Sequence, residues 1–353
     1  MRFALITTAA SVLLAACVTG TDEVAVTPET DAEAVVDLVE DMAAEAPTLE
    51  DPYLWMEEVE GEQALAWVNA QNDRSLDAIK SHSLFEDNYA KALDLATSTD
   101  RIPYGRVRDG MVYNFWQDET DVRGLWRRTN LESYKTDAPD WETVLDFDQL
   151  AADEDKNWVF KGSNCFKPEG ATKTLCFVAL SDGGKDAVIN REFDLEAKSF
   201  VEGGFETLEA KQAVAWSDHD TVLIGTDWGG DGSTLTESGY PSSIRIWTRG
   251  QNLEDATEVY VGDKSDVAVW PWASELDDGT MIYGVQESDT FFTRTYYLLE
   301  NGSATAFPLP KKASLGDDYQ GWQFVTLQED WTVGDQSFKT GDLVAFNLQQ
   351  FLD

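Results

Sequence analysis

The sequence predicts an all-β protein, a β-propeller that follows a short helical segment. From about Arg101 onward the apolar residues lose helical spacing and form short runs rich in β-branched and aromatic residues. Turn signals such as Asp109-Gly110 separate these runs, as in sandwiches, barrels and propellers. An internal repeat, described next, favours the propeller over the other two folds.

The repeat is a strand with basic, aromatic or amide residues, followed by a polar turn. Successive copies lie roughly 50–60 residues apart, close to the ~40–50 residues of a four-stranded propeller blade. We therefore expect about five blades over residues 99–353, with open edge strands that favour self-association. The copies begin at Leu125, Val188, Ile244, Thr295 and Leu343.

The expected strands are short and regularly spaced along this region. They cover residues 104–107, 111–116, 124–128, 158–166, 174–180, 188–193, 213–217, 221–226, 243–248, 257–261, 267–272, 280–285, 294–299, 322–326 and 343–347.

Residues 1–17 have the pattern of a bacterial lipoprotein signal peptide. Arg2 supplies the positive charge, an apolar run follows, and Leu14-Ala-Ala precedes Cys17. The expectation is cleavage before Cys17, lipidation of Cys17, and export to the periplasm or cell envelope. The alternative is an ordinary secretory signal with an incidental Cys. The run is short for a membrane span, so membrane contact is expected only through the lipid.

Residues 18–50 predict a disordered acidic tether. Residues 21–50 hold ten acidic residues, no basic residue and no aromatic ring. Such a stretch buries too little apolar surface to offset the entropy of ordering. A transient helical turn at residues 34–42 is the alternative.

Residues 51–98 predict helices. Asp51 precedes Pro52, a good first helical residue, and after Gly61 the apolar residues Leu65, Val68, Leu76 and Ile79 recur at helical spacing. On pattern alone this is a small helical hairpin in front of a larger domain.

Two motifs in this segment resemble the N-terminal signature of the prolyl oligopeptidase family of serine peptidases. They are Asp51-Pro-Tyr-Leu-Trp-Met-Glu57 and Ala64-Leu-Ala-Trp-Val-Asn-Ala-Gln-Asn72, with Met56 and Glu58 where Leu and Asp are commoner. The resemblance runs from Asp51 to the last residue. It implies that residues 51–98 pack on a C-terminal α/β-hydrolase domain, which this sequence lacks. It also implies a seven-bladed propeller, of which the five expected blades are an incomplete ring.

Composition restricts the partners. The chain has 353 residues, 66 acidic against 26 basic, and a formal charge of −40. This charge argues against nucleic acid or an anionic membrane surface as a partner. Solubility in a salty exterior explains most of the charge, and attraction of basic peptides is a secondary consequence.

Cys165 and Cys176 are expected to form a disulfide. They are equidistant from the centre of the turn at residues 167–173, so they face each other across a hairpin. In an exported protein such a bond persists and stabilises the fold by ~2–3 kcal/mol. Two buried thiols are the alternative. A catalytic Cys is disfavoured because no His lies near in sequence.

The search for catalytic and metal-binding motifs is negative. There is no Gly-x-Ser-x-Gly elbow, and the two histidines, His82 and His219, fit capping or surface positions better than a general base. No Cys/His cluster exists, and the acidic runs at 153–155 and 277–279 fit turns better than a calcium site. We therefore expect no catalytic residue, no metal and no cofactor in this chain.

One loop is the candidate site. Residues 226–241 are long, Gly-rich and polar, in a place where two residues would have closed the turn. A plain solvent loop is one interpretation. The resemblance implies another: a mobile loop facing the hydrolase domain that controls substrate entry. The candidate contacts are Asp227, Trp228, Thr236, Glu237 and Tyr240.

Three functional hypotheses follow. The resemblance implies the propeller portion of a prolyl-oligopeptidase-like serine endopeptidase, which gates short peptides to a hydrolase that cleaves after proline. Without the Ser, His and Asp of that domain the chain alone is expected to be inactive, and to meet peptides only when a catalytic domain is supplied. The alternatives are a self-contained propeller that binds peptide or carbohydrate, aided by 13 Trp and 11 Tyr, and one half of a split peptidase.

Overall fold

The computed structural model describes residues 51–350, apart from residues 59, 169, 277, 320 and 349 and the side chain of residue 317. The expected signal peptide, Cys17 and the acidic tether lie outside the described residues. Contacts divide the chain into two units, residues 1–86 and 87–353, which we describe separately.

The first unit contains a 3-10 helix, η1 (Leu54–Glu57), and the helix α2 (Glu62–Lys80). Asp51 Oδ1 accepts the Tyr53 N–H at 2.8 Å, which forms a local turn just before η1. Helix α2 leaves its predicted apolar stripe exposed: Leu65, Val68, Leu76 and Ile79 are 42–56% exposed. No described helix is long and apolar enough to cross a membrane.

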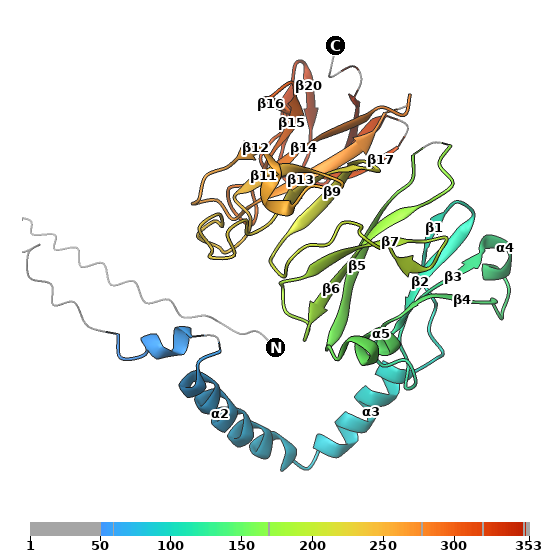
Figure 1. Cartoon of the computed structure of the whole chain (residues 1–353), viewed down its shortest axis with the longest axis vertical. Helices are drawn as coiled ribbons and strands as arrows, with labels where there is room; N and C mark the ends of the chain where they lie inside the picture. The colour runs from blue at the N-terminus through green and yellow to red at the C-terminus, as the bar shows by residue number, and fades with distance from the viewer. Residues whose placement is uncertain are drawn as a thin grey trace, which may run out of the picture. The chain divides into compact units, whose positions relative to one another are not determined.

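The second unit begins within α3 (Phe85–Thr97) and continues as five antiparallel sheets (Figure 1). Blade 1 is β1 (Arg106–Arg108), β2 (Met111–Trp116), β3 (Leu125–Asn130) and β4 (Glu142–Asp146). Blade 2 is β5 (Trp158–Phe166), β6 (Leu175–Asp182), β7 (Ile189–Asp194) and β8 (Ser199–Phe200). Blade 3 is β9 (Ala213–Asp218), β10 (Thr221–Gly225), β11 (Ser243–Thr248) and β12 (Thr257–Val261). Blade 4 is β13 (Ala268–Glu275), β14 (Met281–Ser288), β15 (Thr295–Glu300) and β16 (Ser303–Ala306). Blade 5 is β17 (Ala313–Tyr319), β18 (Trp322–Leu327) and β21 (Leu343–Asn347).

Three short helices and a hairpin lie in the connections between the strands of these sheets. The helices are α4 (Leu131–Tyr134), α5 (Phe147–Glu154) and η2 (Leu253–Asp255). The hairpin of β19 (Trp331–Val333) and β20 (Gln336–Phe338) is inserted between β18 and β21. Trp331 and Phe338 stack across it at 5.5 Å and pack on blade 5, so the insertion is anchored to its blade.

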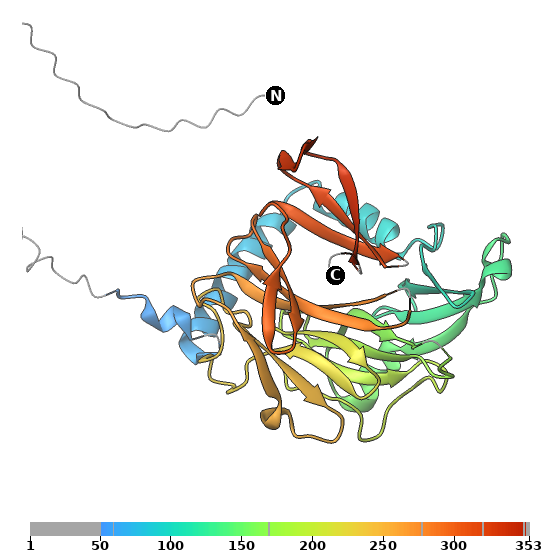
Figure 2. The ribbon, with the colours of Figure 1, turned by 90° about the horizontal axis from the view of Figure 1, so that it is seen from above.

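Each sheet is a meander in which hydrogen-bonded neighbours follow one another along the chain. The sheets succeed one another around an arc in chain order, from cyan to red (Figure 2). The first strands of neighbouring blades touch, β5 with β9 and β9 with β13, which places the first strand on the inner side. The predicted propeller of about five blades is confirmed.

The sequence repeat marks one strand position in every blade. Its five copies fall on β3, β7, β11, β15 and β21, the third strand of each sheet. Six observed strands were not predicted: β4, β8, β16, β17, β19 and β20. The first three are short, and β16 is exposed at every residue, so no alternation of apolar residues announces it.

The sheets hold one another through apolar interfaces. Neighbouring blades share four clusters of buried side chains. The clusters at the interface of blades 1 and 2 and at the interface of blades 2 and 3 are rich in aromatic rings, and the buried residues at the interface of blades 3 and 4 are aliphatic. Representative members are Trp126, Phe147 and Phe193 for blades 1 and 2, Phe177, Phe205 and Trp216 for blades 2 and 3, Leu223, Val269 and Val285 for blades 3 and 4, and Tyr296, Phe307 and Leu348 for blades 4 and 5.

A buried ion pair crosses from blade 2 to blade 3. Glu192 on β7 has a side chain that is only 1% exposed, and Arg249, just after β11, donates to both of its oxygens at 2.7 and 2.9 Å. The Phe205 N–H also donates to Glu192 at 2.8 Å, and the Arg249 guanidinium lies over the Phe205 ring. Asp220 takes a further Arg249 N–H at 2.8 Å. Every polar atom of the Glu192 carboxylate is thus satisfied by blade 3 or its connection.

We expect the Arg249→Ala substitution to destabilise the chain by about 3 kcal/mol, because it leaves Glu192 charged and buried without its partner. Urea unfolding followed by circular dichroism measures this. The exposed pair Lys135–Glu132 supplies the control, since Lys135→Ala should cost under about 0.5 kcal/mol. Equal losses in the two variants would contradict the assigned role of Arg249.

Candidate functional site

The candidate site lies at one end of the blades, which we call the loop end. It is formed by the turns between second and third strands, residues 117–124, 183–188, 226–242 and 289–294, and by the connections between blades. Because each sheet is a meander, these segments share one end, and hydrogen bonds join them. Gly183 N–H donates to Asn157 O, Val188 pairs with Ala210, and Arg294 N–H donates to Lys311 O.

The loop at residues 226–241 is folded on itself by side chains at its base. The Asp227 carboxylate accepts from Gly232 N at 3.0 Å and from Thr234 Oγ1 at 3.1 Å. Thr234 Oγ1 in turn accepts the Trp228 N–H, and Gly230 and Gly232 supply the positive φ angles that this tight course requires. Asp227 is therefore a structural residue of the loop, directed inward.

The loop is also attached to the connection between blades 3 and 4. Thr236 Oγ1 donates to Val267 O, and the Glu237 N–H donates to Lys264 O, both at 2.8 Å. Lys264 Nζ returns a bond to Ser233 O at 2.7 Å. Thr236 is buried by these contacts, whereas the Glu237 side chain is exposed. Of these two candidates only Glu237 presents its side chain to solvent.

Two aromatic residues of the loop stack with basic side chains from elsewhere. Tyr240 lies edge-on to Trp270 at 5.5 Å, and Lys211 Nζ stands 4.4 Å from the centre of its ring. Arg245 Cζ lies 4.3 Å above the Trp228 ring. Both side chains are half-buried, and Trp228 Nε1 is buried without a hydrogen-bond partner among the described residues.

Sequence reasoning missed two parts of the loop end. Lys211 and Trp270 lie in other blades, and nothing near Tyr240 in the sequence points to them. The tip between β14 and β15 carries Phe291 and Phe292, each 74% exposed. A Phe-Phe pair flanked by Thr in a polar turn was the available signal, because rings in such a position have no core to enter.

The two histidines lie between elements of regular secondary structure. His82 Nδ1 accepts the Leu84 N–H at 3.2 Å before α3, and His219 lies in the β9–β10 turn with its ring edge-on to Phe166. Neither lies near a nucleophile in a catalytic arrangement. Within the described residues no group of three or more His, Cys, Asp or Glu side chains is arranged to hold a metal.

Cys165 and Cys176 pair across β5 and β6, and the structure joins them by a disulfide with a Cα–Cα distance of 3.9 Å. Cys176 is fully buried in the cluster between blades 1 and 2. The bond lies near the end of the blades opposite the loop end, so it supports the fold rather than the candidate site.

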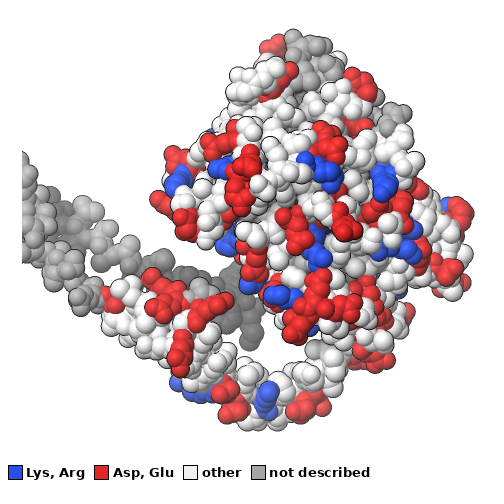
Figure 3. Space-filling model, viewed as in Figure 1, with Lys and Arg blue, Asp and Glu red and all other residues white. Residues whose placement is uncertain are grey.

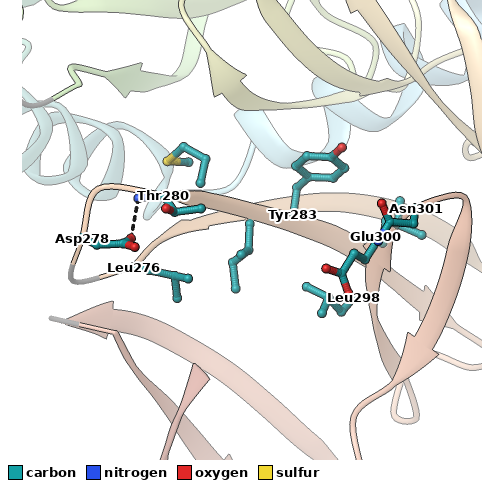
Figure 4. Close-up of a pocket in the computed structure, with 10 residues that line it drawn as sticks. Leu276, Asp278, Thr280, Tyr283, Leu298, Glu300 and Asn301 are labelled. Atoms are coloured by element: carbon teal, nitrogen blue, oxygen red, sulfur yellow. Dashed lines mark hydrogen bonds between the residues drawn. The ribbon is translucent and has the colours of Figure 1, made fainter. Parts of the chain in front are cut away.

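A hollow lies on blade 4 at the end opposite the loop end (Figure 4). It measures about 390 Å³ and has Leu276 and Leu298 in its wall, with Asp278 and Glu300 at the rim. Asp278 accepts the Thr280 N–H at 2.9 Å, which lowers the pKa of its carboxyl. Asp278 and Thr280 therefore stabilise the β13–β14 turn. The lining residues do not form a pair of nucleophile and base.

The visible surface carries more acidic than basic side chains. On the face seen in Figure 3, patches of acidic side chains lie among uncharged residues, and basic side chains are fewer. At the loop end the pKa of Asp231 is lowered by hydrogen bonds from the Ser233 side chain and N–H, so the loop tip stays charged. A cationic or neutral ligand is therefore favoured there over an anionic one.

Comparison with known proteins places the chain. Residues 30–351 match the family model of the prolyl oligopeptidase N-terminal beta-propeller domain. The chain is 36% identical over 309 residues to an uncharacterized peptidase of Sinorhizobium fredii, with 86% of this chain and 42% of that protein aligned. An uncharacterized peptidase of Rickettsia prowazekii is 30% identical, with 84% and 42% aligned.

Solved structures of peptidases share the fold of this chain. A post-proline cleaving enzyme from Rickettsia typhi superposes with a TM-score of 0.74 at 29% identity, over 84% of this chain and 44% of that one. Oligopeptidase B from Leishmania major shares the fold, with a TM-score of 0.53 at 14% identity over 78% and 37% of the two chains. This chain thus spans about two-fifths of the length of the relatives it matches. It belongs to the prolyl oligopeptidase family and corresponds to that family's N-terminal β-propeller domain.

Proposed function

We propose that this chain is the peptide-gating propeller portion of an exported serine endopeptidase that cleaves after proline. The observation that carries the proposal is the match itself. The aligned part of each peptidase relative is the propeller, and the Rickettsia typhi relative is a post-proline cleaving enzyme. In this proposal the propeller selects peptides and a hydrolase domain supplies the nucleophile, the base and the oxyanion donors.

The loop end is the face that we assign to the hydrolase domain. Val122, Leu208, Phe291 and Phe292 project from this end with 65–75% exposure. Large apolar side chains gathered at one end of a soluble protein are typical of a protein interface. The exposed apolar stripe of α2 is the second surface that we assign to the same domain.

Gating is assigned to the loop at residues 226–241. Its inner residues, Asp227 and Thr236, hold its shape, while Glu237 and Tyr240 are accessible. A loop fixed at its base and accessible at its tip excludes bulky polypeptides and allows short chains to pass. The acidic surface favours peptides with basic or neutral side chains.

Export and lipid anchoring rest on Leu14-Ala-Ala-Cys17 alone. An exported location agrees with the Cys165–Cys176 disulfide, because such bonds persist in oxidising compartments. The proposed address is the periplasmic side of the cell envelope, with residues 18–50 as the tether.

The chain alone should not hydrolyse peptides. We expect purified residues 18–353 to release no fluorophore from a blocked Gly-Pro-fluorophore substrate above the buffer rate, because the chain has no Gly-x-Ser-x-Gly nucleophile elbow. Joining residues 51–353 to the hydrolase domain of the Rickettsia typhi enzyme should give post-proline cleavage. Hydrolysis by the unjoined chain that is blocked by a serine-directed inhibitor would refute this assignment.

The loop should determine substrate length. In the joined enzyme, we expect replacement of residues 229–239 by Asn-Gly to raise kcat/KM for a long unstructured polypeptide several-fold relative to that for a short peptide, because the barrier at the entrance is removed. Shortening the exposed connection at residues 135–140, at the opposite end, is the control and should leave the ratio unchanged. An unaltered ratio in the loop variant would exclude gating by this loop.

A further inference from the structure

A pair of carboxyl groups lies between blades 3 and 4, beneath the attachment of the loop. Asp266, in the connection from β12 to β13, is 8% exposed, and Glu287 lies on β14. A Cβ built at Gly262 would stand 2.9 Å from Glu287 Oε1 and 3.7 Å from Asp266 Oδ2. The two acids therefore share one small space, in which a second negative charge has no basic partner.

The groups that face this pair are mostly acids and phenols. From β15, the Tyr297 hydroxyl donates to Glu287 Oε2 at 3.1 Å, and Tyr260 of β12 lies against Tyr297 at 5.5 Å. Burial and the charge of Glu287 raise the pKa of both phenols, so they remain protonated donors. Asp263 lies in the same connection as Asp266. Its N–H donates to Asp266 Oδ2 at 3.2 Å, and its side chain adds a further carboxylate.

The basic groups in this region are engaged elsewhere. Lys311, beyond β16, lies close enough to act on Tyr297 and Glu287 electrostatically, but its Nζ binds Asp289 at 2.7 Å. Lys264 directs its Nζ to Ser233 O in the loop. Neither cation neutralises the pair directly, so a shared proton is the remaining way to relieve the repulsion.

The segment that carries Asp266 also holds the loop. Residues 262–269 bind its C-terminal end: Gly262 N–H donates to Ser242 O, and Val269 N–H donates to Pro241 O. Between them lie the contacts of Lys264 and Val267 with Ser233, Thr236 and Glu237 already described. A displacement of this segment therefore moves the base of the loop.

We propose that Asp266 shares its proton with Glu287 in a latch that fixes the base of the 226–241 loop and releases it when Asp266 ionises. Burial and the charge of Glu287 raise the pKa of Asp266. An acid with a raised pKa in the closed form holds its proton there more tightly, so closure is favoured at low pH. That contribution is lost as the pH rises through the raised value.

The latch would make the gate respond to the pH of the compartment, and in this sense it rests on the proposed function. Its test does not, because loop mobility is measured on residues 18–353 without any hydrolase or peptide. Hydrogen–deuterium exchange read by mass spectrometry reports the loop directly. An unstructured peptide of the same sequence corrects for the chemical pH dependence of exchange.

We expect the corrected exchange rate of residues 226–241 to rise several-fold in the wild-type chain as the pH is raised from acidic to neutral. In Glu287→Gln, which imitates the protonated partner, the loop should stay protected across the range. Glu209→Gln is the matched control. Glu209 lies at the same end in an ordinary ion pair with Lys185, so this variant should behave as the wild type.

Corrected exchange that does not change with pH in the wild-type chain would overturn the latch. So would an unaltered pH dependence in Glu287→Gln. If that variant fails to fold, Asp266→Asn gives the same test from the other side of the pair, since its amide oxygen keeps the bond from Asp263 N–H. If neither variant folds, the wild-type pH profile decides.

Discussion

The fold depends on the fact that its middle sheets are covered on both faces by neighbouring sheets. In β6 the adjacent residues Phe177 and Val178 are both buried, the first against blade 3 and the second in the cluster with blade 1. In β10, Val222 points to blade 2 and Leu223 to blade 4. Each such side chain contributes roughly 1.5–3 kcal/mol only when it is covered. A blade is therefore stable because of its neighbours, and the packing of the blades positions the segments of the loop end.

Charges in these apolar interfaces are neutralised in two different ways. Between blades 2 and 3 the buried Glu192 is matched by the guanidinium of Arg249, which donates to both carboxylate oxygens. Between blades 3 and 4 the pair Asp266 and Glu287 has no such partner, and a proton takes its place. The first arrangement fixes the blades, and the second allows the connection under the loop to respond to pH.

Much of the fold was predictable because it follows from periodicity along the chain. The third strands repeat in sequence, and the second strands are apolar on both faces, as in β6, so both kinds were expected. The outermost strands β4, β8 and β16 were not, because they are short and none shows a clear alternation of buried and exposed residues. The sequence of β17, with Gly316 and two Asp, also lacks an apolar alternation.

The candidate site was predictable only in part, for a related reason. The Gly-rich loop is visible in the sequence, as is the symmetric placement of Cys165 and Cys176 about their turn. The contacts of Tyr240 with Lys211 and Trp270 are not, because each partner comes from a different strand or connection, about thirty residues away. The same holds for Asp266 and Glu287. Such pairs exist only once the blades are packed, and nothing local in the sequence encodes them.

Mutual packing makes the blades one cooperative unit. Hydrogen exchange of the whole chain in rising urea tests this cooperativity, because amides in β6, β10 and β14 report three different blades. We expect these amides to become exchangeable at one common urea concentration. Separate transitions for the three strands, with one middle blade exchanging while its neighbours remain protected, would contradict it.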